Sequence, residues 1–197
     1  MARSICALIA AAGRGSRAGL PYPKTLFVVQ DRPILLRVID ALGPESDRLV
    51  VVASPDGAGP IHDCLESAGI DAQVAVQEAP RGMGDAVLSA EAASHFAGAE
   101  HVLLAWGDIP FIQPATVKGM VEAHLAHGND LTLATALTDA AYTVVSRDAE
   151  GRFVALHETR ESGDARPAAG ERDIGLFIFR RAPMVEMLMA GRGRGNG

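Results

Sequence analysis

A run of five apolar residues near the start of the chain, Ile5 to Ile9, constrains the fold more than any other stretch. Apolar side chains without polar alternation are typical of a strand buried on both faces, as in a parallel sheet covered by helices. The run passes into three alanines and then Gly13, so the side chains shrink and disappear where the strand ends. Backbone without side chains can approach a ligand closely and aim its N–H groups at an anion. The stretch therefore predicts a buried strand that ends at a ligand-binding loop.

Three cationic side chains follow in the same segment: Arg14, Arg17 and Lys24. Lys24 comes after Pro-Tyr-Pro, which favours extended backbone. At about 4 Å, each cation–phosphate pair contributes on the order of 4 kcal/mol at an effective dielectric constant of 20. Several such pairs are needed to replace the hydration of a polyphosphate. The segment has neither the third glycine of the dinucleotide-binding fold nor the Gly-Lys-Ser/Thr ending of the P-loop. It predicts a polyphosphate site of another kind, and the alternative is a surface loop with scattered arginines.

Apolar periodicity divides most of the chain into alternating strands and helices. The expected elements are an extended segment at 25–29, a helix at 33–42, a strand at 49–53, a loop at 54–60, a helix at 61–68, strands at 74–76 and 101–106, a helix at 114–126 and a strand at 131–137. Alternation of this kind predicts an α/β fold of three layers, with helices on both sides of a doubly wound, mainly parallel sheet. Ligands of such folds bind at the carboxyl ends of the strands, where the opening loop would also lie.

Two further turns follow expected strands and would lie at the same edge of the sheet. The first is the Gly-rich segment 77–86, and the second is Gly107-Asp108-Ile109-Pro110. A carboxylate directly after a buried strand is well placed to hold Mg²⁺, which takes few protein ligands and shares the rest with phosphates and water. Each turn also has an ordinary interpretation, with Asp85 as a helix-start residue and Asp108 as a turn or cap residue.

From residue 138 onward the pattern changes to short strand candidates at 142–146, 153–157 and 174–179, which predict a small β-rich flap. A final amphipathic helix is expected at 183–189, ending at Gly191. Residues 191–197 have no core-forming side chain, so we expect a flexible tail there.

Composition narrows the class of protein. The chain has 197 residues, of which 48% are hydrophobic, and this length and content suit one globular domain. Its formal net charge of −6, without a basic run, disfavours nucleic acid as a partner. Without a signal sequence or an apolar run of membrane-spanning length, we expect a cytoplasmic protein with Cys6 and Cys64 reduced. His124 and His127 are expected to be satisfied or surface histidines, and the oligomeric state stays open.

The motifs resemble those of one enzyme family. Gly13-Arg14-Gly15-Ser16-Arg17 with Pro23-Lys24 resembles the signature of the sugar-1-phosphate nucleotidyltransferases, which have the MobA-like NTP transferase fold. Segment 77–86 and Trp106-Gly107-Asp108-Ile109-Pro110-Phe111 are similar to two further motifs of that family. The uridylyltransferase domain of N-acetylglucosamine-1-phosphate uridylyltransferase is the member that the chain resembles most. The resemblance covers residues 4–190 and implies a nucleotidyltransferase domain at 1–190 that lacks the family's C-terminal portion, with its second metal ligand.

The resemblance also implies roles for individual residues. The implied catalytic residues are Arg17, Lys24 and Asp108, and Asp108 would also hold Mg²⁺. The implied sugar-binding residues are Glu158 and Asp173, and Asp173 stands where the family has Asn. The implied nucleotide-binding residues lie in the two loops and the turn, and they are Ala11, Ala12, Gly13, Arg14, Gly15, Lys24, Gln77, Gly82, Met83 and Gly107.

The resemblance implies a reaction between a nucleoside triphosphate, UTP above others, and a sugar 1-phosphate such as N-acetylglucosamine 1-phosphate. A nucleoside diphosphate-sugar and pyrophosphate would be the products. One alternative is a related transferase with another phosphorylated acceptor, such as a molybdopterin or a methylerythritol phosphate. Another is a nucleotide-binding module without catalysis.

Overall fold

The computed structural model describes residues 4–13, 19–79, 81–138, 143–158 and 170–192. The chain forms two compact units. The first comprises Met1–Thr132 and Phe177–Gly197, and the second comprises Leu133–Leu176.

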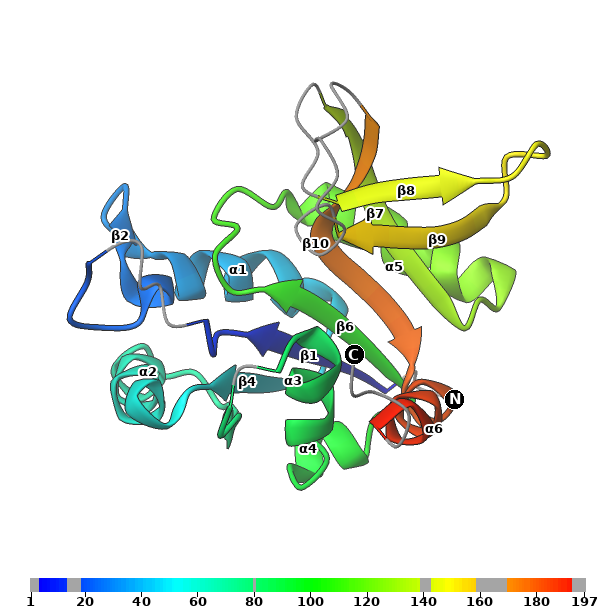
Figure 1. Ribbon diagram of the computed structural model, residues 1–197. Helices are drawn as coiled ribbons and strands as arrows, with labels where there is room; N and C mark the ends of the chain where they lie inside the picture. Colours follow the sequence, from blue (N-terminus) through cyan, green and yellow to red (C-terminus); the bar gives the residue numbers. More distant parts are fainter. Residues whose placement is uncertain (1–3, 14–18, 80, 139–142, 159–169, 193–197) are drawn as a thin grey trace. The chain divides into compact units, whose positions relative to one another are not determined.

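The central sheet has six strands, and β1 lies in its middle (Figure 1). Their order is β5 (Gln73–Val76), β4 (Arg48–Ala53), β1 (Ile5–Ala10), β6 (His101–Trp106), β10 (Gly170–Arg180) and β7 (Leu131–Thr138). β1 pairs in parallel with β4 and with β6, and β4 pairs in parallel with β5. In this register Ala10 lies beside Val52 and Trp106, so three neighbouring strands end at one edge. The expected α/β fold with a mainly parallel sheet is confirmed.

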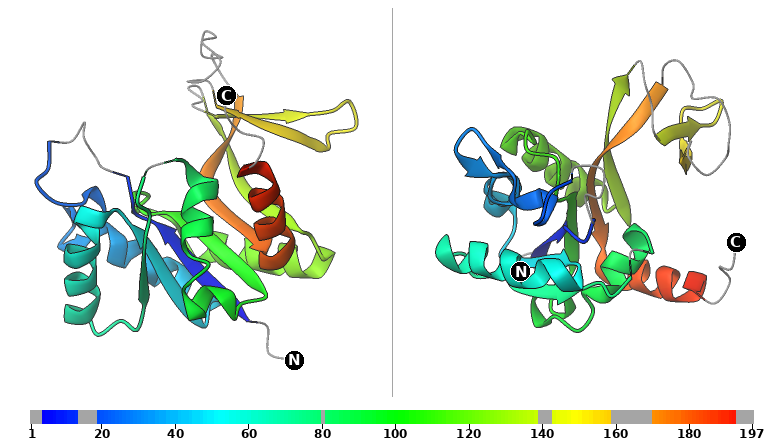
Figure 2. Two further views of the ribbon diagram at one scale, coloured as in Figure 1. Left: turned by 60° about the horizontal axis from the view of Figure 1, so that its bottom comes forward. Right: turned by 60° about the vertical axis from the view of Figure 1, so that its left-hand side comes forward.

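Helices cover both faces of this sheet (Figure 2). On one face lie α3 (Met83–Ser89), α4 (Ser94–Ala97) and α6 (Arg181–Arg192), and on the other lie α1 (Ile34–Leu42) and α5 (Pro114–His127). Alternate residues of three strands face α3, α4 and α6 in one buried cluster: Cys6, Leu8, Val50, Val52, Val102 and Leu104. The residues between them are buried too, Ile9, Val51 and Leu103 among them. Because side chains alternate across a strand, burial on both faces gives the uninterrupted apolar runs of the sequence.

The segment after β1 contains a short 3₁₀ helix at Lys24–Leu26 and the hairpin of β2 (Val28–Val29) and β3 (Arg32–Pro33). The two residues of its turn, Gln30 and Asp31, have φ of 49° and 63°. Positive φ at both central positions is the geometry of a type I′ turn, whose twist matches that of paired antiparallel strands. A second 3₁₀ helix, at Gly43–Glu45, connects α1 to β4.

The expected loop at 54–60 is wrong, because α2 spans Pro55–Ser67 and so begins six residues before the expected helix start at Ile61. Ser54 caps the helix, with its side chain accepting a hydrogen bond from Gly57 N at 3.2 Å. Pro55 at the first helical position lacks the N–H that would have no partner there, and Asp56 places a negative charge in the first turn. These start signals outweigh the low helix propensity of two glycines and Pro60.

The expected end of the last helix is also wrong. α6 extends from Arg181 to Arg192, so Gly191 and Arg192 belong to a helix and not to a flexible tail. A single glycine inside a helix costs only about 1 kcal/mol relative to alanine, which neighbouring packing can offset. The rest of the expected tail, 193–197, lies outside the described residues.

A chain of buried and half-buried polar groups lies where α5 packs beside the starts of β6 and β7. His124 is fully buried, and its Nε2 lies 3.1 Å from Nδ1 of His101, which is 7% exposed. On its other side, His124 Nδ1 lies 3.0 Å from Thr132 Oγ1, which accepts a hydrogen bond from Asn129 Nδ2 at 3.1 Å. A neutral His124 satisfies both neighbours when Thr132 donates to its Nδ1 and its Nε2–H donates to His101. The histidine is thus satisfied by protein groups, as expected.

Burial lowers the pKa of His124, and the nearby His101 and Arg180 lower it further. The unfolded chain therefore binds a proton more readily than the folded one. Stability is fully present above the unfolded pKa of about 6.5 and falls as the pH drops through that value toward the folded pKa. We expect the urea midpoint of the protein to fall between pH 7.5 and pH 5.5, and to fall less in His124→Gln, which cannot titrate. His127→Gln, on the exposed side of the same helix, is the control. Equal losses in His124→Gln and the unsubstituted protein would contradict this assignment.

The second unit contains an antiparallel hairpin of β8 (Thr143–Arg147) and β9 (Phe153–Glu158). Beside it, Glu171 accepts hydrogen bonds from both Nε and Nη2 of Arg147, at 2.7 and 2.6 Å, and from Thr135 Oγ1 at 2.7 Å. Bonds from Arg147 and then from Thr135 lower the pKa of Glu171 to about 2. This unit matches the expectation of short β-rich structure after residue 138.

Candidate active site

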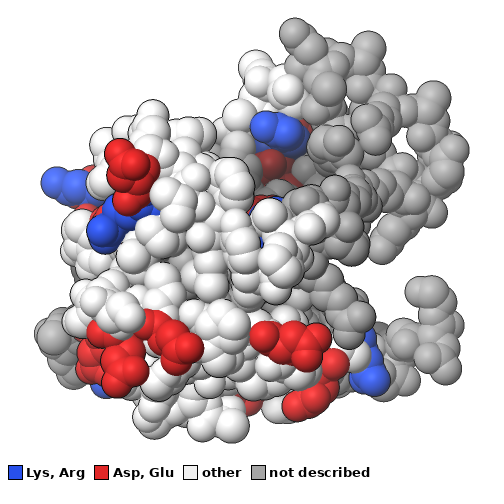
Figure 3. Space-filling view, turned by 90° about the vertical axis from the view of Figure 1, so that its left-hand side faces the viewer, with Lys and Arg blue, Asp and Glu red and all other residues white. Residues whose placement is uncertain are grey.

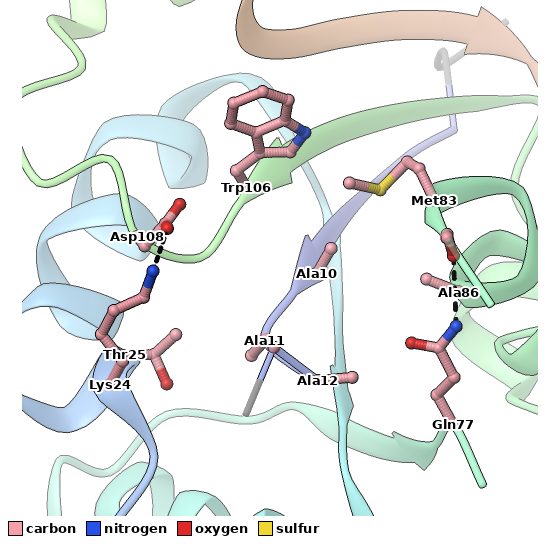
Figure 4. A pocket seen from close by; sticks show the side chains of 12 residues that line it. Ala10, Ala11, Ala12, Lys24, Thr25, Gln77, Met83, Ala86, Trp106 and Asp108 are labelled. Carbon is pink, nitrogen blue, oxygen red and sulfur yellow. Dashed lines mark hydrogen bonds and ion pairs between the residues drawn. The ribbon is translucent and has the colours of Figure 1, made fainter. Parts of the chain in front are cut away.

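A cavity of about 350 Å³ opens in the first unit at the carboxyl ends of β1 and β6 (Figure 4). Its volume is at the lower end of the range for small-molecule sites. Four separate stretches of the sequence form its walls. They contribute Ala10, Ala11, Ala12, Gly13, Lys24, Thr25, Gln77, Gly82, Met83, Ala86, Trp106 and Asp108.

The floor is the end of β1, where small side chains leave the backbone accessible. Ala11 continues the sheet through a hydrogen bond from its N–H to Val52 O at 2.8 Å. Ala11 and Ala12 are buried, whereas Gly13 is exposed. A Cβ added to Gly13 would meet no described atom within 4 Å. Packing against the described residues therefore does not require glycine at this position, and the open space beside it is available to a ligand.

Gly107 has the opposite environment. A Cβ there would lie 2.9 Å from Thr25 Cγ2, 3.0 Å from Ala10 O and 3.3 Å from Ala11 Cα. The Gly107 N–H also donates to Ala10 O at 2.9 Å, which ties the turn after β6 to the end of β1. Gly107 was predicted to bind nucleotide, but it is not among the residues that line the cavity. It holds the two strand ends close together.

Gly107→Ala is therefore expected to destabilise the protein by about 1–3 kcal/mol, because two of the three contacts are with backbone that cannot rotate away. Urea denaturation measures the change. Gly119→Ala is the matched control, since a Cβ at that position of α5 would meet nothing within 4 Å. The control is expected to be neutral or more stable by up to about 1 kcal/mol. If both variants match the parent protein, the close approach at Gly107 does not constrain the fold.

Lys24 and Asp108 form an ion pair at the mouth of the cavity, with Nζ 2.5 Å from Oδ2. Their side chains are 40% and 37% exposed, so water reaches both. Lys24 lies in the 3₁₀ helix after Pro23, whose extended backbone (φ −54°, ψ 130°) agrees with the expectation for Pro-Tyr-Pro. Asp108 follows β6, so the topology of the sheet brings together two charges that are 84 residues apart in sequence. A half-exposed pair contributes little to stability, which leaves both groups available to a ligand.

The opposite wall consists of Gln77, Gly82, Met83 and Ala86. Gln77 is 5% exposed, and its backbone N–H donates to Ala53 O at 2.8 Å at the end of β4. Gly82 precedes α3 with φ 96° and ψ −177°, a conformation essentially confined to glycine. The second Gly-rich segment thus needs glycine at Gly82 for its backbone geometry, and it returns the chain to the cavity at Met83.

Most of the residues predicted to bind nucleotide or to act in catalysis lie around this cavity. Ala11, Ala12, Gly13, Lys24, Gln77, Gly82, Met83 and Asp108 all line it. Arg14, Gly15 and Arg17 lie outside the described residues. The roles assigned to these residues stay predictions.

The two predicted sugar contacts belong to the second unit. Glu158 ends β9, where it lies opposite Thr143. Asp173 is 3% exposed, and its carboxylate is already used: Thr143 Oγ1 donates to Oδ2 at 2.6 Å and Gly175 N donates to Oδ1 at 3.0 Å. Gly175 has φ 75°, so Asp173 stabilises a bend in β10 that favours glycine. In the described structure its carboxylate supports the backbone of its own unit.

Sequence reasoning missed four residues of the cavity: Ala10, Thr25, Ala86 and Trp106. Thr25 and Trp106 are next or nearly next to predicted site residues, and Ala86 lies three residues after Met83, on the same side of a helix. Thr25 is 4% exposed, and its Oγ1 has no hydrogen-bond partner among the residues that the structure describes. Sequence reasoning also missed the hydrogen bond that Gln77 donates to Asp85, a residue that does not line the cavity.

Three observations concern other kinds of partner. On the face shown in Figure 3, acidic side chains, including those of α2, gather along the lower part, and no basic surface of comparable extent is seen there. Among the residues with described structure, no helix combines the length and the apolarity needed to cross a membrane. Within the same residues, no group of three or more His, Cys, Asp and Glu side chains could hold a metal ion.

A parallel sheet with its cavity at the carboxyl ends of the strands is the arrangement of nucleotide-binding α/β proteins. Residues 7–173 match the model of the MobA-like NTP transferase domain, and the chain belongs to this family. The predicted family is thus confirmed.

Curated relatives agree with this assignment. The bifunctional protein GlmU of Pelotomaculum thermopropionicum is 33% identical over 187 residues, which make up 93% of this chain and 40% of the relative. The bifunctional protein GlmU of Caldanaerobacter subterraneus is 28% identical over 176 residues, or 88% of this chain and 37% of the relative. The chain thus spans well under half the length of both relatives.

Solved structures show the same fold. A putative glucose-1-phosphate thymidylyltransferase from Bacillus anthracis superposes with a TM-score of 0.79 at 16% identity, covering 98% of this chain and 79% of that one. A 4-diphosphocytidyl-2C-methyl-D-erythritol synthase from Anaerococcus prevotii gives 0.66 at 18% identity, covering 97% and 77%. Since the identities are this low, these likenesses concern the fold alone.

Proposed function

We propose that the protein is a nucleotidyltransferase that transfers a nucleoside monophosphate from a nucleoside triphosphate to a sugar 1-phosphate, with release of pyrophosphate. UTP and a sugar of the N-acetylglucosamine 1-phosphate type are the proposed substrates. The observation that carries the proposal is the meeting of Lys24 and Asp108 beside the side-chain-poor end of β1, in a cavity of nucleotide-binding topology. Family membership and the similarity to GlmU proteins support it.

In the proposed reaction a phosphate oxygen of the sugar phosphate attacks the α-phosphorus in line. The bond from that phosphorus to the oxygen bridging to the β-phosphorus breaks, and pyrophosphate leaves with the bond's electron pair. This chemistry needs positioning and charge neutralisation and no covalent intermediate. Lys24 would neutralise charge that develops on the phosphates, with Arg14 and Arg17 contributing from the same loop. The backbone of Ala11 to Gly15 would hold the triphosphate, and Gln77 would face the base.

Magnesium is the proposed cofactor, with Asp108 as its protein ligand. Asp108 is the one carboxylate among the described residues that line the cavity, and it is 37% exposed at the cavity mouth. Mg²⁺ typically takes one or two carboxylates and fills its other positions with phosphate oxygens and water, so this donor set fits. When bound, the ion would supply positive charge that offsets the negative charge of the phosphates. Lys24 Nζ now binds one oxygen of Asp108, and in the proposed reaction it would turn toward the phosphates.

The acceptor side of the proposal rests on the second unit. Glu158 is the proposed contact to the sugar, at the end of β9. Asp173 accepts hydrogen bonds from Thr143 and from the Gly175 N–H. We propose that it supports the acceptor site by fixing this backbone, because both of its oxygens are already engaged. The free state of Cys6 and Cys64 fits a reducing compartment such as the cytoplasm.

The test is pyrophosphate release in the presence of Mg²⁺, with each of the four nucleoside triphosphates against a panel of sugar 1-phosphates. Release with UTP and an N-acetylhexosamine 1-phosphate is the expected result. Release only with a methylerythritol phosphate or a molybdopterin would replace the proposed acceptor and keep the transferase. Saturable triphosphate binding without release from any pair would favour a nucleotide-binding module and contradict the proposed catalysis.

A further inference from the structure

The side-chain amide of Gln77 is held by two oxygens that can only accept hydrogen bonds. Its Nε2 donates to Gly82 O at 3.1 Å and to Asp85 Oδ2 at 2.9 Å. A carbonyl oxygen and an ionised carboxylate have no hydrogen to give, so the NH₂ end of the amide must face them. The orientation of the amide therefore follows from its partners, and does not depend on distinguishing nitrogen from oxygen directly.

The other end of the amide points into the cavity. Figure 4 shows the oxygen of Gln77 directed away from the hydrogen bond, toward the side where Ala12 lies. This Oε1 accepts no hydrogen bond from the part of the chain that the structure describes, although Gln77 is 5% exposed and lines the cavity. The site thus offers a fixed acceptor to whatever binds against this wall.

Asp85 acts on this acceptor from outside the cavity. It does not line the cavity, but borders a separate depression with Arg81, Leu88 and Leu188. One hydrogen of Nε2 is donated to Gly82 O, and without Asp85 the second would lack a partner among the described residues. A buried amide N–H without a partner carries a penalty, which the amide could reduce by turning that hydrogen toward the cavity.

We infer that Asp85 is a positioning residue for base recognition, which holds the Gln77 amide so that Oε1 accepts from an N–H donor of the nucleobase. For the proposed substrate UTP, the donor is the ring N3–H of uracil. The inference rests on the proposed function for the identity of the ligand. In this inference, Asp85 determines whether the side chain of Gln77 accepts a hydrogen bond from the base or donates one to it.

Calorimetric titration in the presence of Mg²⁺ tests the proposed role of Asp85 directly. The ligands are UTP, N3-methyl-UTP, which lacks the donor, and inorganic tripolyphosphate, which lacks the base. We expect the unsubstituted protein to bind N3-methyl-UTP about tenfold or more weakly than UTP, since the methyl group leaves Oε1 unpaired and adds bulk. In Asp85→Leu we expect UTP to bind about tenfold more weakly and the preference over N3-methyl-UTP to shrink to about threefold or less. Tripolyphosphate affinity should stay within about twofold.

Two further variants complete the experiment. Asp85→Asn keeps the shape and one acceptor oxygen but can also donate, so an intermediate loss of preference is expected, and this variant decides the question if Asp85→Leu does not fold. Asp63→Leu places the same leucine at an exposed site of α2, where the side chain is 82% exposed, and should bind like the parent.

The inference is overturned if the Asp85 variants keep the full preference for UTP over N3-methyl-UTP. It is also overturned if UTP and tripolyphosphate affinity fall together, because that pattern indicates loss of structure. Preference lost in the variants without pyrophosphate release from any acceptor would uphold the inference and contradict the proposed catalysis. Pyrophosphate release together with an unchanged preference for UTP over N3-methyl-UTP would uphold the proposed catalysis and overturn the inference. An absence of UTP binding would overturn both the inference and the proposed catalysis.

Discussion

Replacing Asp108 by asparagine is expected to lower the turnover number by about 10³-fold or more, because the variant loses the carboxylate that would hold Mg²⁺ against the reacting phosphates. The affinity for the nucleoside triphosphate should change by no more than about tenfold, since the base and the loop contacts are untouched. The turnover number should fall more than the affinity because Asp108 lies at the mouth of the cavity, across from the Gln77 wall (Figure 4). Pyrophosphate release and calorimetric binding measure the two quantities separately.

The fold should survive this substitution. The Lys24–Asp108 pair is 40% and 37% exposed, and exposed pairs contribute about 0–1 kcal/mol. Asp40→Asn is the matched control, because it breaks a similarly exposed pair with Arg32 on another surface. The control is expected to keep full activity. Asp108→Asn with near-parental turnover would remove Asp108 from the proposed mechanism, and a low urea midpoint in that variant would point to structure as the cause of any loss.

The cavity shows why sequence patterns locate some sites well. Strands buried on both faces give uninterrupted apolar runs, so the expected strand at 101–106 has the bounds of β6. Once the strands are known to be parallel, the residues that follow them must share one edge. That argument alone brings together the end of β1, Gln77 and Asp108. The family resemblance supplied the expected roles of these residues, but the topology suffices to place them together.

What the sequence did not show depends on contacts between distant segments or on competing local signals. The start of α2 was misplaced because Gly57, Gly59 and Pro60 indicate a loop, whereas the cap at Ser54 decides the outcome. Asp173 was expected to face a sugar, and its hydrogen bonds to Thr143 and to Gly175 N became visible only with β8 and β10 in place. The link from Gln77 to Asp85 is similar, since the geometry of the turn through Gly82 sets it and no residue pattern encodes it. Sequence therefore predicted which residues meet, whereas the role of each one stays a prediction.

Lys24→Met is expected to lower kcat/KM by about 10²–10³-fold, and to weaken triphosphate binding as well. A cation about 4 Å from a phosphate contributes on the order of 4 kcal/mol at an effective dielectric constant of 20, and partial exposure reduces that figure. Methionine keeps much of the length and the apolar stem of lysine and removes the charge. The loss should grow smaller as salt is added, because the interaction being removed is itself screened.

The position of Lys24 separates its expected phenotype from that of Asp108. Lys24 Nζ is bound to Asp108 Oδ2 in the described structure, and the proposed reaction moves it to the phosphates. Lys24→Arg keeps the charge but not its point-like geometry, so we expect partial activity. Lys118→Met, in an exposed pair with Glu122 on α5, is the control and should behave as the parent. If Lys24→Met instead binds the triphosphate normally and turns over at the parental rate, Lys24 serves only to hold Asp108, and the phosphate charge must be met by Arg14 and Arg17.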